Sequence, residues 1–137
     1  MELMIAVAIV AILAAIAYPS YLAYAERSDR TDATTTMFND AQVLERCYSQ
    51  TFDYTKCLTA YAPAPAGVTQ LSPTSPSPQG YYSVSVQTPA ADQYTITATP
   101  ARSPQTSDSQ CQSFTLQSSG AQGSTGSASS QTCWGSN

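Results

Sequence analysis

The stretch Glu2-Leu-Met-Ile-Ala-Val-Ala-Ile-Val-Ala-Ile-Leu-Ala-Ala-Ile-Ala-Tyr18 decides the fold of this chain. It carries one carboxylate, at Glu2, and no other charged or strongly polar side chain before Pro19 closes it. As a helix it would rise about 25 Å, slightly less than the ~30 Å hydrocarbon core of a bilayer. The residues beyond it are polar and rich in turn formers. The sequence therefore divides into an apolar rod, residues 1–24, and a globular domain, residues 25–137.

Three interpretations of the apolar rod compete. A secretory signal peptide would carry basic residues before its apolar run, whereas here only an acid precedes it. A core helix of a soluble domain would have a polar face, and Leu3 to Ala17 has none. A membrane helix is therefore favoured. In an apolar environment the Glu2 carboxylate must be protonated or paired, and no cation lies within reach along the helix. Its partner must then be the N-terminal amine or another molecule.

Composition excludes several functions. The 137 residues allow one domain plus an appendage, only 10% of them are charged, and the net charge is −4. This charge argues against electrostatic binding of nucleic acid, because the few cations are scattered: Arg27, Arg30, Arg46, Lys56 and Arg102. The chain has no His, the commonest general base and metal ligand, and no phosphate-binding glycine loop. We predict a protein that is not an enzyme and that uses no cofactor.

The acidic residues do not form an evident metal site. Asp29 and Asp32 are the only close acidic pair after the rod, and we expect both on an exposed helix face. A loop cation site at Asp92 or Asp108 is a disfavoured alternative. We therefore predict no bound metal.

The four cysteines indicate disulfides. Without His to complete a tetrahedral site, zinc is disfavoured, and two bridges in an oxidising compartment are favoured. Four cysteines allow three connectivities. The simplest pairs those nearest in sequence, Cys47 with Cys57 and Cys111 with Cys133. Each bridge would stabilise a small core by about 3 kcal/mol.

Periodicity predicts the secondary structure of the globular domain. Apolar residues recur on one helical face over residues 25–50, at Met37, Ala41, Leu44 and Tyr48. Residues 51–79 are expected to form a loop because of their prolines, Pro63, Pro65, Pro73, Pro76 and Pro78. Period-two alternation then predicts strands around 82–86, 94–98 and 114–116, within a sheet spanning 80–118. Residues 119–137 form a C-terminal loop. The fold class is α+β, with the long helix lying across an antiparallel sheet.

The run from Glu2 to Tyr21, with its glutamate and Pro19, resembles the N-terminal signature of type IV pilins. In that family a phenylalanine-threonine-leucine-apolar-glutamate start follows the cleavage site of a leader peptide. Met1 fills the apolar position, and we expect the first three mature residues to precede this chain. The sequence departs from the family at Ala11, where glycine is common, and at Tyr18, where an aliphatic residue is common. Because Pro19 removes a backbone donor, we expect a kink or an unwound stretch within residues 12–20.

The resemblance implies roles for individual residues. It implies that Glu2 sets the register of assembly by meeting the N-terminal ammonium of a neighbouring subunit. It implies that the apolar rod packs in a filament core, through Leu3, Ile5, Ile9, Ile12, Leu13, Ile16, Tyr18, Tyr21 and Tyr24. The Cys47–Cys57 segment and the Cys-Trp ending also resemble pilin patterns. The tyrosines equally suit a membrane interface.

The implied function is that of a structural subunit of a bacterial type IV pilus. The expected partners are copies of the same chain, the inner membrane, the prepilin peptidase and the pilus assembly machinery. The expected location is the inner membrane and then an extracellular filament serving adhesion, twitching motility or DNA uptake. The alternatives are a minor pilin or type II secretion pseudopilin, and a monomeric membrane-tethered binding domain. A disulfide-bearing C-terminal loop favours a pilin over a pseudopilin.

Overall fold

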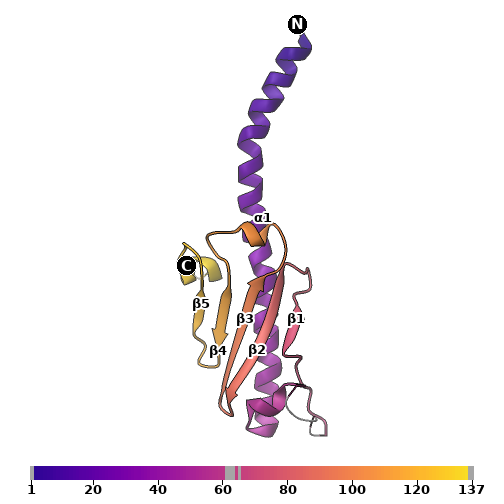
Figure 1. Ribbon diagram of the computed structural model, residues 1–137, viewed down its shortest axis with the longest axis vertical. Coiled ribbons are helices and arrows are strands. Elements are labelled where there is room, and N and C mark those ends of the chain that lie inside the picture. Colours follow the sequence, from indigo (N-terminus) through magenta and orange to yellow (C-terminus); the bar gives the residue numbers. More distant parts are fainter. Residues whose placement is uncertain (1, 61–63, 65, 136–137) are drawn as a thin grey trace.

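A computed structural model describes residues 2–60, 64 and 66–135. One helix, α1 (Glu2–Thr51), runs the length of the molecule. Its upper half projects alone, while its lower half crosses one face of a sheet (Figure 1).

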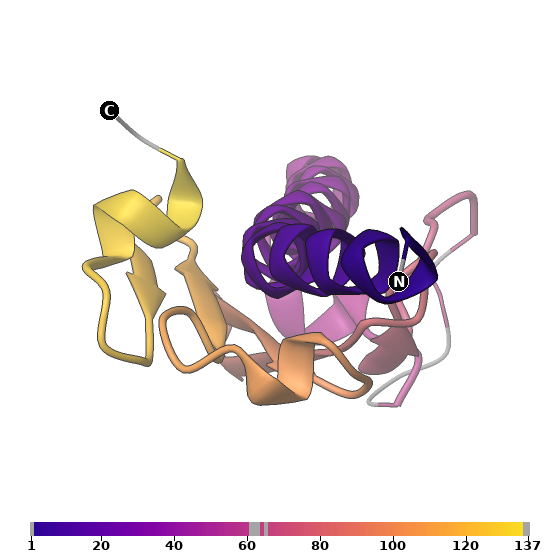
Figure 2. The same ribbon diagram turned by 90° about the horizontal axis from the view of Figure 1, so that it is seen from above.

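Helix α1 is continuous through Pro19, so of the two alternatives predicted for residues 12–20, a kink or an unwound stretch, the unwound stretch is wrong for this structure. The upper half curves gently instead, as Figures 1 and 2 show. A single proline removes one backbone hydrogen bond, and the alanines on either side, Ala14, Ala15, Ala17, Ala23 and Ala25, favour helix strongly enough to continue through it.

The sheet has five antiparallel strands in sequence order. Its three longer strands, all predicted, are β2 (Tyr82–Ala90), β3 (Gln93–Pro100) and β4 (Phe114–Gln117). The two edge strands, β1 (Thr74–Pro76) and β5 (Gln122–Ser124), lie in segments for which the sequence predicts loops. Each is only three residues long, too short for a period-two signal. Pro76 is tolerated because β1 is an edge strand.

The core lies between the lower half of α1 and the inner face of the sheet. From the helix, Met37 and Leu44 are fully buried, as the apolar stripe predicted. They meet the inward side chains of the central strands, which alternate in burial along each strand, including Tyr82, Ile96 and Phe114. Because the apolar stripe of α1 and the inner face of the sheet bury each other, the core of the globular domain needs no side chain from the apolar rod.

Three short helices complete the domain: η1 (Tyr54–Cys57), η2 (Gln105–Ser107) and α2 (Ser130–Trp134). Helix η1 lies at the lower end of α1, and α2 lies beside α1 near the top of the domain (Figures 1 and 2). A disulfide joins Cys47 to Cys57, and a second joins Cys111 to Cys133. The two bridges therefore sit at opposite ends of the domain, each attaching a loop segment that has little core of its own.

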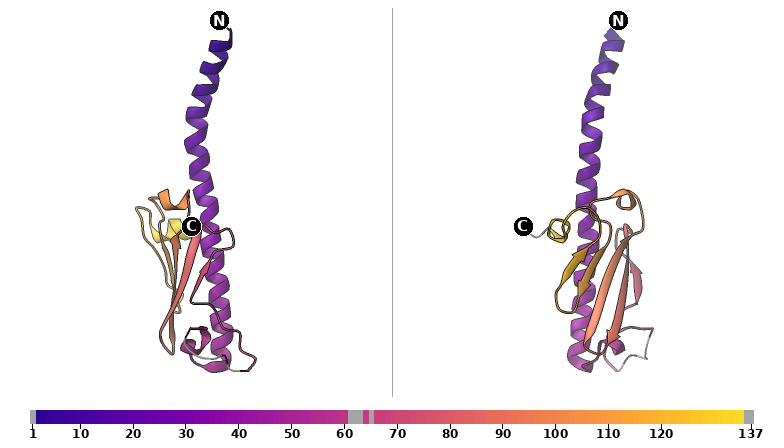
Figure 3. Two further views of the ribbon diagram at one scale, coloured as in Figure 1. Left: turned by 45° about the vertical axis from the view of Figure 1, so that its right-hand side comes forward. Right: turned by 60° about the vertical axis from the view of Figure 1, so that its left-hand side comes forward.

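The upper half of α1 is bare on all sides (Figure 3). By length and composition, α1 is able to cross a membrane, and none of its most apolar window is buried. A helix that is apolar all round is stable only when surrounded by lipid or by other protein.

Candidate functional site

The exposed rod is the most extensive candidate site. Every side chain that the resemblance assigns to a filament core is exposed here: Leu3, Ile5, Ile9, Ile12, Leu13, Ile16, Tyr18, Tyr21 and Tyr24. Exposure ranges from 53% at Ile9 to 76% at Leu3. Together with Met4, Val7 and Val10 these side chains form a continuous apolar surface, far larger than single exposed apolar residues on an ordinary soluble domain.

The structure describes Pro19 fully, but it describes only the backbone of Glu2. Pro19 lies inside the helix, on the last exposed turns before the globular domain. Glu2 begins the helical backbone, and its side chain lies outside the described residues. Its role in register therefore stays a prediction.

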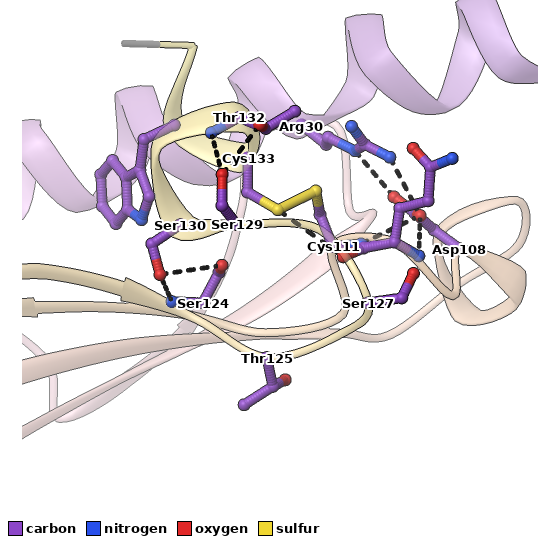
Figure 4. Close-up of a disulfide and its surroundings, with 12 residues drawn as sticks. Arg30, Asp108, Cys111, Ser124, Thr125, Ser127, Ser129, Ser130, Thr132 and Cys133 are labelled. Carbon is purple, nitrogen blue, oxygen red and sulfur yellow. Dashed lines mark hydrogen bonds and ion pairs between the residues drawn. A yellow bond between two sulfur atoms is a disulfide. The ribbon is translucent and has the colours of Figure 1, made fainter.

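A buried ion pair holds α1 to the loop before β4. Arg30 donates from Nε to Asp108 Oδ2 at 2.7 Å and from Nη2 to Asp108 Oδ1 at 3.0 Å (Figure 4). The carboxylate also accepts the backbone N–H groups of Gln110 and Cys111 at 2.9 and 3.1 Å. Burial alone would raise the pKa of Asp108, but these hydrogen bonds outweigh it and hold the pKa below its ordinary value. Asp108 is thus committed to Arg30, which removes it as a loop cation ligand.

A second buried contact lies beside the first. Gln105, on η2, is fully buried and donates from Nε2 to the backbone carbonyl of Glu26 at 3.0 Å. Its Oε1 accepts the hydroxyl of Tyr82 at 2.7 Å. Burial raises the pKa of that hydroxyl well above its ordinary value, so Tyr82 remains a donor. The segment between β3 and β4 therefore grips the helix where the rod leaves the domain.

Asp32 forms the third buried contact, and the prediction that it is exposed is wrong. Its carboxylate accepts the hydroxyl of Ser77 and the backbone N–H of Gln79 at 3.3 Å. Ser77 Oγ in turn accepts the Tyr82 backbone N–H at 3.1 Å. These partners lie far away in the sequence, so helical periodicity alone could not reveal them.

The C-terminal loop packs against α1 as well as the sheet. Trp134 packs edge-to-face on Phe38 of α1 and on Phe114 of β4, and its Nε1 donates to the Gly123 carbonyl at 2.9 Å. In Figure 4 the Cys111–Cys133 bridge lies between this loop and the Arg30–Asp108 pair. The Cys-Trp ending therefore joins three elements, which the sequence predicted only in part.

The lower end of the domain carries an aromatic cluster. Tyr54 stacks on Tyr48 with ring centroids 4.3 Å apart and packs edge-to-face on Tyr94. Its hydroxyl donates to Glu45 Oε1 at 2.9 Å. Burial, followed by Glu45, raises the pKa of Tyr54 well above its ordinary value. This cluster secures the lower end of α1 to η1 and β3.

Among residues 2–60, 64 and 66–135, no group of His, Cys, Asp or Glu is arranged to hold a metal ion. The buried contacts described above hold the globular domain together, and the apolar surface of the rod is left uncovered.

The family model described as "Type IV minor pilin ComP, DNA uptake sequence receptor" matches residues 19–115. The matched region begins at the proline that ends the apolar run and extends into β4. A search of curated proteins finds no match.

Proposed function

Since the chain belongs to the type IV minor pilin family, we propose that it is a subunit of a type IV pilus that enters the filament through its rod. The observation that carries this proposal is the bare apolar surface from Leu3 to Tyr24 on an otherwise well-packed pilin domain. Family membership associates the chain with a type IV pilus system and with a structural rather than a catalytic role.

The rod would serve two environments in turn. Before assembly it would lie in the inner membrane, where its length and lack of charge suit the hydrocarbon core. In the filament it would exchange lipid for the rods of neighbouring pilins, so the same side chains stay out of water. The assembly machinery and the prepilin peptidase are the partners that this route requires, and the extracellular surface is its end point.

Glu2 would set the register of this packing. In a core of apolar rods an unpaired carboxylate is very costly, so only the register that brings it to a cation is favoured. The proposed cation is the N-terminal ammonium of a neighbouring subunit in the mature filament.

The experiment compares Glu2→Ala with Glu26→Ala, an acid at the base of the rod, in cells that produce the pilus. We expect Glu2→Ala to remain in the inner-membrane fraction but to fall at least tenfold in the sheared filament fraction, while Glu26→Ala stays near wild type. Immunoelectron microscopy would locate both variants. Equal amounts of wild-type and Glu2→Ala protein in filaments would refute the register role. Absence of the wild-type chain from filaments would refute the proposed function itself.

A second candidate function, DNA reception, is favoured by the description of the matched family as a DNA uptake sequence receptor. It is compatible with the first, because a pilus subunit carries its domain to the cell surface. The net charge of −4 requires that any DNA contact be local rather than spread over the surface. Binding of labelled duplex DNA by the full-length protein in neutral detergent tests it directly.

The remaining alternatives predict different outcomes. A type II secretion pseudopilin would be required for protein export. A monomeric tethered domain would stay in the membrane fraction and tolerate Glu2→Ala without loss of function. Immunogold labelling of filaments by an antibody against the globular domain would count against both.

A further inference from the structure

A polar groove of about 640 Å³ lies between α1 and the C-terminal loop, at the base of the rod. Arg27 and Arg30 contribute its helix wall, and Gln110, Gln131 and Thr132 contribute to the opposite wall. Its volume is in the range of ligand-binding clefts and is too large for a packing defect. The function proposed above does not use it.

The charge of this groove differs from that of the whole molecule. Among the described residues that line it there are two guanidinium groups and no carboxylate, although the chain carries a net charge of −4. Asp108 lies behind Arg30 and is neutralised by it. Arg27 is exposed, and no ion pair joins it to another described residue. An anionic group entering the groove would therefore meet one unpaired guanidinium and one that is held in place.

The other cationic side chains of the chain are less suited to bind an anion together. Lys56 lies 3.5 Å from Asp53, and Arg102 lies over the ring of Tyr81, 5.6 Å from its centroid. Arg46 lies near the lower end of α1, at the opposite end of the domain from the groove. The groove is thus the place on the described surface where two arginines line one hollow without an acid.

The far wall supplies groups of a different kind. Gln110 and Gln131 are exposed, and each carries an amide able both to donate and to accept hydrogen bonds. The Thr132 hydroxyl adds another such group. Arginine positions a nucleic-acid backbone through its phosphates, while amide side chains read base edges. One wall therefore suits a phosphate and the opposite wall suits a base.

We propose that this groove is the DNA contact of the protein, with Arg27 binding a backbone phosphate and Gln110 and Gln131 facing the adjacent bases. This inference rests on DNA reception, the second candidate function above. Arg30 lies one helical turn from Arg27, but its charge is compensated by Asp108, so Arg27 is the cation available to the phosphate. With about one phosphate neutralised, binding is weak and its salt dependence is shallow, with a logarithmic slope of about −1.

The test measures binding of fluorescein-labelled duplex DNA that carries the host's uptake sequence. The full-length protein is kept in neutral detergent. Fluorescence anisotropy of the DNA is measured from about 20 to about 200 mM salt, a range over which counterion release is measurable. Arg27→Gln is compared with Arg46→Gln, a matched loss of one exposed arginine on the same helix. Gln131→Glu, which places an acid in the groove, is compared with Gln50→Glu at the lower end of α1.

We expect Arg27→Gln to weaken binding about tenfold and to reduce the salt slope by about 1, and Arg46→Gln to change neither. Gln131→Glu should weaken binding more than Gln50→Glu. If wild type binds and Arg27→Gln and Arg46→Gln behave alike, the groove is refuted while DNA reception stands. If wild type does not bind, DNA reception and the groove site are both refuted, while the filament role is unaffected. If Arg27→Gln retains DNA binding but is lost from filaments, the groove belongs to a subunit interface instead.

Discussion

Arg30 of α1 and Asp108 of the β3–β4 segment form a two-point ion pair across 78 residues of sequence, with both side chains buried. Two neighbouring buried contacts, Gln105 to Glu26 and Asp32 to Ser77, grip the same part of the helix. The three contacts surround the point where the apolar rod leaves the globular domain. They fix the direction of the rod relative to the domain, which a subunit needs if rod packing is to place its domain reproducibly in a filament.

Replacing Arg30 by Met should destabilise the globular domain by about 3–5 kcal/mol, because the Asp108 charge is left buried without its partner. Urea unfolding at pH 7.5, followed by the fluorescence of Trp134, measures the effect. Arg27→Met is the matched control and should cost no more than about 0.5 kcal/mol, since Arg27 is exposed.

A second variant separates charge from shape. Arg30→Met combined with Asp108→Asn removes the uncompensated charge while keeping an acceptor for the Gln110 and Cys111 N–H groups. It should be more stable than Arg30→Met alone. Equal stability of the single and double variants would mean that Arg30 acts through packing rather than through the pair.

Asp40 should oppose folding as the pH rises. Burial raises its pKa from 3.8 to about 6, and its Oδ2 has no hydrogen-bond partner among the described residues. The folded state therefore holds a proton that the unfolded state has lost, so stability falls between pH 4 and pH 6 and is constant above. Since the side chain is only partly buried, we discount the loss to about 1–2 kcal/mol.

The measurement compares Asp40→Asn with Asp92→Asn, a change in the exposed β2–β3 turn, by thermal unfolding at pH 4 and pH 7.5. Asp40→Asn should raise the melting temperature at pH 7.5 and change it little at pH 4. Asp92→Asn should have little effect at either pH. A gain from Asp40→Asn that is equal at both pH values would exclude the ionisation of Asp40 as its cause.

Loss of either disulfide should lower the stability of the domain by a similar amount, but the two losses should release different segments. Loss of either bridge should destabilise the domain by about 3 kcal/mol. Loss of Cys111–Cys133 should also free Trp134 from Phe38 and Phe114, and should therefore shift its fluorescence to longer wavelength under native conditions. The paired substitution of Cys47 and Cys57 by Ala should leave that emission unchanged. A red shift in both variants would contradict this division.

The sequence predicted those parts of the fold that depend on local periodicity. The long helix follows from the apolar rod and from the stripe through Met37 and Leu44, and the three longer strands follow from period-two alternation. Burial of Arg30 and Asp32 was missed, because a polar side chain on a helix gives no sign of a partner many residues away. The edge strands β1 and β5 were missed because three residues are too few to show a period. Exposure of the rod was predicted, whereas the groove beside it depends on tertiary packing.

Gly126 should be the glycine least tolerant of substitution in the C-terminal loop. Its φ is +127°, and an added Cβ would lie 2.2 Å from the backbone oxygen of Gln110. Gly120 offers a matched control, because its φ of +81° is also positive but nothing lies within 4 Å of an added Cβ. Gly120→Ala should therefore cost about 1 kcal/mol for the backbone alone, and Gly126→Ala about 2–4 kcal/mol because the backbone at Gln110 must also move. Urea unfolding of both variants tests this difference. An equal loss of stability in the two variants would show that the close approach of Gly126 to Gln110 is not maintained in solution. Since Gln110 lines the groove, Gly126→Ala should also weaken DNA binding more than Gly120→Ala does.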